Sequence, residues 1–263
     1  MSKKLLIYLL IVIGTILVVG YFFFQPTSKE ETEDPLLQKI KSEGKIVIGL
    51  EANYPPMESI DQNGNFTGID IEIAKEIASD LGVKPEFKNI SWDKLFDALL
   101  QGEADILISA ITITPERSEK MAFSDPYFNA GQVIVTTLNR NDIKGVNDLK
   151  GKKIGVQIDT TSETEAKKYT DPNLVISFQD YVLAKESLLK GEIDAIIIDY
   201  PAAIGMVSEE KKLIIVGEPF TQEFYGIALR KEDKTLLNKI NQTLRKLNKE
   251  GKIKEIEQKW LSE

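Results

Sequence analysis

The sequence has neither cysteine nor histidine among its 263 residues. The absence of cysteine excludes a disulfide framework, a thiolate metal site and a cysteine nucleophile. The absence of histidine removes the usual general base and the commonest zinc ligand, which excludes most hydrolase and metalloenzyme mechanisms. A net charge of −8 disfavours nucleic acid as a partner, because that binding depends on Lys and Arg neutralising phosphates. We therefore expect no metal, no cofactor and no nucleic acid.

The N-terminal segment carries a long apolar run. Lys3 and Lys4 precede an uncharged stretch from Leu5 to Phe24, and a positive start followed by an apolar run is typical of an export signal. At ~1.5 Å per residue the run is long enough to span ~30 Å of hydrocarbon. No small-x-small cleavage site follows it, and Tyr21 stands where a lipoprotein carries its acylated cysteine. These features favour an uncleaved membrane anchor within residues 1–24 over a cleaved signal, with the rest of the chain extracytoplasmic.

Strands and helices are predicted to alternate along most of the chain. After a polar linker over residues 25–44, with some helix near 36–40, short β-rich runs alternate with amphipathic stretches. This pattern is typical of α/β proteins with largely parallel sheets. Lys45–Leu50 predicts a strand, and residues 68–81 predict a helix because their apolar positions recur at helical spacing. The next expected elements are a strand at 85–90, a helix at 92–102 and a strand at 105–112.

An internal repeat indicates two similar units. Residues 99–109, LLQGEADILIS, align without gaps to residues 188–198, LLKGEIDAIII, and the strand–helix pattern around both copies is the same. The chain therefore contains two βαβαβ units in series. Ligands of open α/β sheets bind beyond the carboxyl ends of the strands. That edge holds residues 109–112 in one unit and Asp199 in the other, so two lobes that face each other there form a cleft.

The expected fold class is α/β, with two βαβ-type lobes joined by two hinge crossings. Gly131–Thr137 and Tyr225–Arg230 are the candidate crossings. Lobe 1 is then predicted over residues 45–131 plus 226–263, and lobe 2 over 132–225. Two crossings make a hinge, which suits closure around a ligand.

Five segments carry a resemblance to a known family: GIDIEIAKEIASDL (68–81), SAITITPERSEKMAFSDPYF (109–128), VQIDTTSE (156–163), GEIDAIIIDY (191–200) and KWL (259–261). In this order they resemble the family 3 extracellular solute-binding proteins, the polar amino-acid class. The resemblance implies the type II periplasmic-binding-protein fold, clamshell closure, a free L-amino acid as ligand, and partnership with the permease and ATPase of an ABC importer. We expect a monomer. Two departures stand out: the lipidated cysteine common in the family is missing, and Asp159 replaces the usual glycine before the paired threonines.

A free amino acid is a zwitterion, so its site needs a cation for the carboxylate and an anion for the ammonium. Arg117 suits the carboxylate because a guanidinium binds it with two parallel hydrogen bonds. Thr114 can cap the short helix in which this arginine lies, with Pro115 as its first residue. Asp199 suits the ammonium because it follows an apolar strand, where an unpaired carboxylate is costly. The plainer alternatives are a surface arginine and a carboxylate that only caps a helix before Pro201.

Further contacts to the backbone groups of the ligand are expected from the strand end and from the resemblance. They are Ser109, Ala110, Thr112, Thr161 and Ser162. The last two open the first helix of lobe 2, where their N–H groups would complete the carboxylate site. As plain helix N-caps, these two residues would look the same in the sequence.

The resemblance also assigns contacts to the ligand side chain. Tyr54 and Trp92 stand where family members place hydrophobic walls, and two aromatic rings would add cation–π attraction to a cationic side chain. Glu51 and Gln157 align with positions that face the distal end of the side chain. Without the resemblance, the aromatic residues would be interpreted as core and the two polar residues as ordinary strand ends.

These features predict a binding protein for a polar or basic L-amino acid, without catalytic activity. Arginine is the first expectation, because Glu51 offers a counter-charge, and glutamine is the second, because Gln157 and a carboxylate could bind an amide. One alternative is an enzyme of the dehydratase type on the same fold, which an ammonium-binding Asp199 beside Arg117 and the absence of histidine argue against. The other is an extracellular sensor domain, which would need a separate signalling partner.

Overall fold

The computed structural model describes residues 34–261. The predicted anchor within residues 1–24, and the part of the predicted linker before residue 34, lie outside this range. Within residues 34–261, none of the helices combines the length and the apolar character that crossing a bilayer requires.

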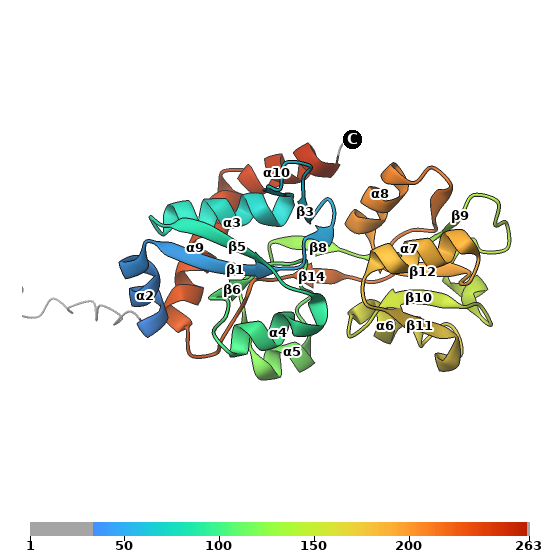
Figure 1. The fold of residues 1–263 in the computed structure, drawn as a ribbon, viewed down its shortest axis with the longest axis horizontal. Helices are drawn as coiled ribbons and strands as arrows, with labels where there is room; N and C mark the ends of the chain where they lie inside the picture. The colour runs from blue at the N-terminus through green and yellow to red at the C-terminus, as the bar shows by residue number, and fades with distance from the viewer. Residues whose placement is uncertain (1–33, 262–263) are drawn as a thin grey trace, which may run out of the picture. The chain divides into compact units, whose positions relative to one another are not determined.

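The first lobe is built on a five-stranded mixed sheet (Figure 1). Its strands, in spatial order, are β5 (Lys84–Asn89), β1 (Lys45–Leu50), β6 (Ile106–Leu107), β15 (Ala228–Leu229) and β7 (Ala122–Phe123). The first three are parallel, and β15 is antiparallel to both of its neighbours. Helix α3 (Ile69–Asp80) packs on one face with Ile106, and α4 (Trp92–Leu100) packs on the other with Leu107. Successive residues of a strand point to opposite faces, which accounts for this division.

The second lobe repeats this plan. Its strands, in spatial order, are β11 (Val175–Phe178), β10 (Ile154–Gln157), β12 (Ala195–Asp199), β9 (Gln132–Thr137) and β13 (Leu213–Val216). Again the first three are parallel and the fourth is antiparallel to its neighbours. Helices α7 (Tyr181–Lys190) and α8 (Tyr200–Glu209) pack on one face, and α6 (Thr161–Ala166) packs on the other. The predicted fold class, α/β with two lobes, is confirmed.

The two copies of the sequence repeat occupy equivalent places. Residues 99–109 contain the end of α4 and strand β6, and residues 188–198 contain the end of α7 and most of β12. The predicted strand over 105–112 is only partly formed, because β6 ends at Leu107. Shortly after it, Ala110 adopts a left-handed backbone conformation (φ 46°), which an extended strand cannot include.

A two-stranded ribbon runs between the two lobes (Figure 1). Its strands, β8 (Phe128–Ala130) and β14 (Glu223–Tyr225), pair in antiparallel fashion. The crossings therefore lie a few residues earlier than predicted. Most of the first candidate, Gly131–Thr137, is strand β9 of the second sheet, and β15 lies within the second candidate, Tyr225–Arg230. An apolar run predicts a strand without showing which sheet it joins, which is why the sequence misplaced the crossings.

Smaller elements complete the chain. They are β2 (Asn53–Tyr54), β3 (Glu58–Ile60), β4 (Phe66–Thr67), α5 (Pro115–Lys120), the 3-10 turns Val146–Leu149 and Pro172–Leu174, α9 (Lys234–Lys249) and α10 (Lys252–Leu261). Strands β2, β3 and β4 form a small antiparallel sheet.

Helix α2 (Pro35–Glu43) is packed on the first lobe. Its Leu37 and Ile40 are fully buried in the same core as α3, α9 and α10. Asp34 caps this helix by accepting a hydrogen bond from Leu37 N at 2.8 Å, and its other oxygen accepts from Thr235 N at 2.8 Å at the start of α9. The second half of the predicted linker is therefore a helix that belongs to the core.

Candidate functional site

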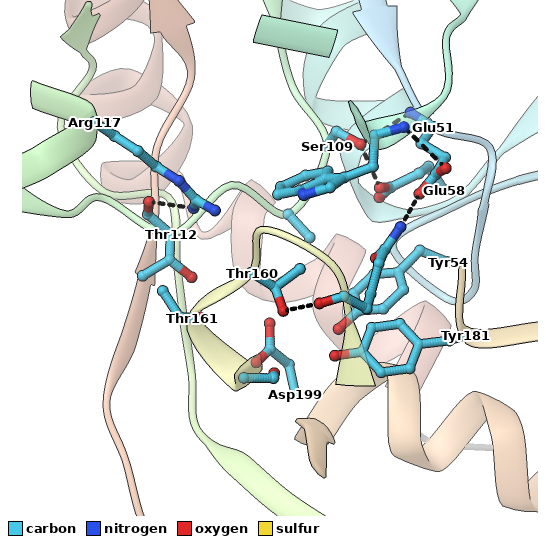
Figure 2. A pocket seen from close by; sticks show the side chains of 14 residues that line it. Glu51, Tyr54, Glu58, Ser109, Thr112, Arg117, Thr160, Thr161, Tyr181 and Asp199 are labelled. Carbon is cyan, nitrogen blue, oxygen red and sulfur yellow. Dashed lines mark hydrogen bonds between the residues drawn. The ribbon is translucent and has the colours of Figure 1, made fainter. Parts of the chain in front are cut away.

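A cavity lies between the two lobes (Figure 2). All eleven residues predicted from the sequence line it, together with three others. The lining residues are Glu51, Tyr54, Glu58, Trp92, Ser109, Ala110, Thr112, Arg117, Gln157, Thr160, Thr161, Ser162, Tyr181 and Asp199.

Arg117 lies at one side of the cavity, opposite Glu51 and Glu58 in Figure 2. Thr114 caps α5 by accepting a hydrogen bond from Arg117 N, and Pro115 is the first helical residue, as predicted. The guanidinium donates from Nη1 to the carbonyl of Thr112 at 2.9 Å. It also lies over the ring of Trp92, 5.3 Å from its centroid. Burial lowers the pKa of Arg117 to about 10, so the group remains a cation at neutral pH.

Asp199 ends strand β12 and stands at the N-cap position of α8, but its side chain makes no capping hydrogen bond. One carboxylate oxygen, Oδ2, accepts a hydrogen bond from the hydroxyl of Tyr225. The other, Oδ1, is buried and has no hydrogen-bond partner among residues 34–261. Burial raises the pKa of Asp199 to about 7, with the charge of Glu223 adding to the increase and Tyr225 and Arg117 opposing it. A buried carboxylate oxygen without a donor is costly, so this atom is suited to a cationic group of a ligand.

Glu51 and Gln157 meet across the cleft. The Glu51 side chain is buried and accepts hydrogen bonds from Gln157 Nε2 at 2.7 Å and from the backbone of Trp92 at 3.0 Å. Gln157 comes from β10 of the second lobe, and its Nε2 also donates to the carbonyl of Gln179 at 3.0 Å. Burial raises the pKa of Glu51, although these two hydrogen bonds favour its charged form.

Ser109 and Ala110 follow strand β6 at the base of the cavity. The Ser109 hydroxyl accepts from Glu51 N at 3.0 Å and donates to Glu58 Oε1 at 2.8 Å. Ala110 donates its backbone N–H to Asp70 Oδ2 at 2.7 Å. This hydrogen bond holds Ala110 in its left-handed conformation (φ 46°), which a residue with a Cβ rarely adopts.

The loop before α6 contributes the second lobe's rim. Thr160 caps α6 through Glu163 N, and its hydroxyl donates to the carbonyl of Gln157 at 2.7 Å. Thr161 Oγ1 accepts from Gln132 Nε2 at 3.0 Å. Ser162 is buried in the first turn of α6. Asp159 has φ 58°, a left-handed conformation that Asp tolerates better than most residues.

Aromatic rings close another part of the cavity. The rings of Tyr54 and Tyr181 lie 5.6 Å apart, one from each lobe. The Tyr181 hydroxyl donates to the carbonyl of Ile197 at 3.2 Å, which fixes this ring against β12. Trp92, predicted as a wall for the ligand side chain, also contacts Phe96 in an edge-to-face arrangement at 5.2 Å.

The lobes touch each other directly at several points. The carbonyl of Asp159 accepts from Trp92 Nε1 and from Arg117 Nη2, each at 3.4 Å. Gly205 of α8 lies against the backbone of Pro55, where an added Cβ would stand 2.4 Å from the Pro55 carbonyl oxygen. These contacts exist only while the lobes are this close.

Three lining residues were not predicted: Glu58, Thr160 and Tyr181. Glu58 lies on β3 of the small sheet, and nothing in a short polar hairpin indicates that its glutamate is buried. Thr160 carries the N-cap signal that was assigned to its neighbours. Tyr181 follows Asp180, which caps α7, so the start of that helix could have pointed to it.

Comparisons with known proteins agree with this architecture. Residues 46–263 match the bacterial extracellular solute-binding proteins, family 3. The L-cystine-binding protein TcyJ of Escherichia coli (strain K12) is 34% identical over 234 residues, which cover 88% of this chain and 88% of that protein.

Two solved structures are also similar. Arginine-bound truncated ArgBP from T. maritima is 43% identical, with a TM-score of 0.76, over 80% of this chain and 99% of that one. An ancestral arginine-binding protein bound to glutamine is 42% identical, with a TM-score of 0.78, over 84% of this chain and 99% of that one. This chain therefore belongs to the family 3 bacterial extracellular solute-binding proteins, the family that its five sequence segments resemble.

Proposed function

We propose that this protein is the extracytoplasmic receptor of an amino-acid ABC importer. It binds a free L-amino acid between its lobes and delivers it to the permease. One observation carries this proposal: a single cavity combines the Arg117 guanidinium with a buried Asp199 oxygen that lacks a donor. These two groups complement the carboxylate and the ammonium of a zwitterion. Relatives whose names state amino-acid binding support the same conclusion.

We assign each lining residue a role in binding the ligand. Arg117 binds the carboxylate of the ligand, with Thr161 and Ser162 completing that end of the site. Asp199 binds the ammonium, and Ala110 and Thr112 contact the same end of the ligand. Ser109 holds the backbone of Glu51 and the carboxyl group of Glu58 in place through its hydroxyl.

We propose a long basic side chain for the ligand, with arginine ahead of glutamine. Glu51 lies across the cavity from Arg117, so it can receive a guanidinium while the zwitterion is held at the other end. Tyr54 and Trp92 flank the aliphatic stem. Glutamine is the second candidate because Gln157 could turn from Glu51 and share an amide with it. The similar structures carry arginine in one case and glutamine in the other.

Calorimetric titration with each common amino acid and with L-cystine tests this proposal. We expect saturable binding that is tightest for L-arginine. In Glu51→Gln, arginine should weaken by ~1–3 kcal/mol and glutamine should change little, because a charge-assisted contact is lost. A tenfold preference of the wild type for glutamine, ~1.4 kcal/mol, overturns the arginine assignment and leaves the receptor role intact. The absence of binding to any amino acid overturns the receptor role itself.

The receptor is proposed to release its ligand unchanged. Chromatography of arginine recovered after long incubation with the protein checks this point, and any product that depends on the cavity residues would favour the dehydratase alternative.

An anchor within residues 1–24 is a separate proposal. Mass spectrometry of the native N-terminus tests it, and a mature chain that begins near Gln25 would overturn it.

A further inference from the structure

We propose that Glu58 and Asp70 share one proton beneath the cavity. A cationic ligand side chain displaces this proton on binding, and the pair is therefore a second determinant of ligand specificity. The inference rests on the proposed function and deepens it. Glu51 is the expected counter-charge for the ligand side chain. The Glu58–Asp70 pair acts in addition to it and changes its net charge when the ligand binds.

The hydrogen bonds around the pair leave one oxygen of each carboxyl group without a donor. Asp70 Oδ2 accepts from Ala110 N at 2.7 Å and from the Tyr127 hydroxyl at 2.9 Å. Glu58 Oε1 accepts from the Ser109 hydroxyl at 2.8 Å. The remaining oxygens, Glu58 Oε2 and Asp70 Oδ1, are buried and have no donor among the described residues. The backbone N–H of Asp70 donates to the carbonyl of Met57 at 2.9 Å, so Asp70 lies beside the residue that precedes Glu58, and one proton between the two carboxyl groups would satisfy both oxygens.

The surroundings do not neutralise two negative charges. Glu58 and Asp70 are 1% and 0% exposed, and neither takes part in an ion pair within residues 34–261. The titratable groups that face them are Glu51, next to β1, Tyr54, on β2, and Tyr127, before β8; none of them is a cation. Burial raises the pKa of each carboxyl, and the charge of Asp70 raises that of Glu58 further. Two neighbouring carboxylates without a cation retain a proton.

Glu58 is the member of the pair that lines the cavity. Glu58 lines the same cavity as Glu51, and Ser109 bridges the backbone of Glu51 to the Glu58 carboxyl. A guanidinium or ammonium placed beside Glu51 therefore lies near three carboxyl groups. Its positive charge stabilises the form in which Glu58 and Asp70 are both ionised, and the shared proton passes to the solvent. A neutral amide brings no such charge and leaves the proton in place.

This mechanism links specificity to pH. Arginine binding should release up to one proton more than glutamine binding, and arginine affinity should rise by as much as about tenfold per pH unit while the pair is protonated. Both amino acids carry the same α-carboxylate and α-ammonium. The contribution of Asp199 is therefore the same for both and cancels in the comparison.

Calorimetry at neutral pH, in buffers of different ionisation enthalpy, measures the protons released by L-arginine and by L-glutamine. Glu58→Gln is the decisive variant, because its amide replaces the shared proton and keeps the shape. We expect wild type to release more protons with arginine than with glutamine, and Glu58→Gln to lose that difference. A difference that persists in Glu58→Gln, or none in a wild type that binds both, overturns the inference.

Asp70→Asn provides a second variant if Glu58→Gln folds poorly. Its amide nitrogen would replace Oδ1 and donate to Glu58, while its oxygen keeps the hydrogen bonds from Ala110 and Tyr127. Unliganded protein supplies an independent measurement. Wild type should lose stability relative to either variant as the pH rises from ~4 through the raised pKa of the folded pair, because the folded pair holds its proton more tightly than the unfolded chain. Parallel stability profiles overturn the shared proton, whereas failure of every amino acid to bind removes the proposed function and the ligand linkage with it.

Discussion

The hydroxyl of Tyr225, on crossing strand β14, donates a hydrogen bond to Asp199, at the end of β12 in the second lobe. The proposed ammonium site is therefore attached directly to the ribbon between the lobes. Tyr225 is fully buried, and its ring stacks on Phe128 of the other crossing strand at 5.6 Å. A change in the charge or position of Asp199 thus acts on the hinge as well as on the ligand.

Arg117 and Asp199, the proposed zwitterion clamp, contact groups that every amino acid carries. Replacing either residue should therefore reduce the binding free energy of every amino-acid ligand by the same amount. Arg117→Gln and Asp199→Asn should each weaken binding by ~2–5 kcal/mol, since each removes a charge-assisted partner in a desolvated site. Arg245→Gln is the matched control, because that arginine is 69% exposed and pairs with Asp125 at the surface. Calorimetric titration checks the result. A clamp variant that binds within about threefold of wild type would contradict the assignment.

Asp199 also predicts a pH dependence of the unliganded protein. Its pKa is raised to about 7 in the fold, against ~3.9 for an exposed Asp. The folded state therefore binds this proton more tightly than the unfolded chain, so the contribution of Asp199 to stability is complete below pH ~4 and is lost as the pH rises to about 7. Thermal unfolding between pH 4 and 8 should show wild type losing stability relative to Asp199→Asn. Parallel curves would refute the raised pKa.

Regular elements and charged site residues could be predicted from the sequence, and contacts between distant segments could not. β1 and α3 follow from local periodicity, and Arg117 and Asp199 follow from charges placed at a helix start and a strand end. The burial of Glu58 depends on a hairpin that brings it under Ser109. The early end of β6 depends on Asp70, forty residues away, which holds the backbone of Ala110. The crossings were misplaced because only the pairing of β8 with β14 identifies them.

A substitution at Gly205 should affect closure of the lobes without lowering the stability of the ligand-free protein. An alanine Cβ there would clash with the Pro55 carbonyl of the other lobe, at 2.4 Å, only when the lobes are together. Gly205→Ala should therefore weaken arginine binding, while unfolding of the ligand-free protein becomes up to ~1 kcal/mol harder because alanine favours the helix. Small-angle scattering should show less compaction on arginine addition than in wild type. Ser208→Ala, exposed on the same helix, serves as the control, and wild-type affinity in Gly205→Ala would show that the contact does not limit closure.

Trp92 offers a test of how the aromatic residues act. The structure places its ring against the Arg117 guanidinium, at 5.3 Å, and its Nε1 toward the Asp159 carbonyl. If Trp92 works by positioning Arg117, then Trp92→Phe should weaken arginine and glutamine by the same factor, corresponding to ~0.5–2 kcal/mol. A loss restricted to arginine would instead support its predicted role as a wall for the side chain. Competition titrations with both amino acids distinguish the two.

Asp34 connects the beginning of the described chain to its last helices. One carboxylate oxygen caps α2 and the other accepts from the first turn of α9, so the first and the last helices of the described residues are fastened to the same lobe. A mechanical load applied at Asp34 would enter the first lobe alone. Within residues 34–261 the second lobe is joined to the first by the ribbon and by contacts across the cleft, so it would then move while the first lobe stays in place.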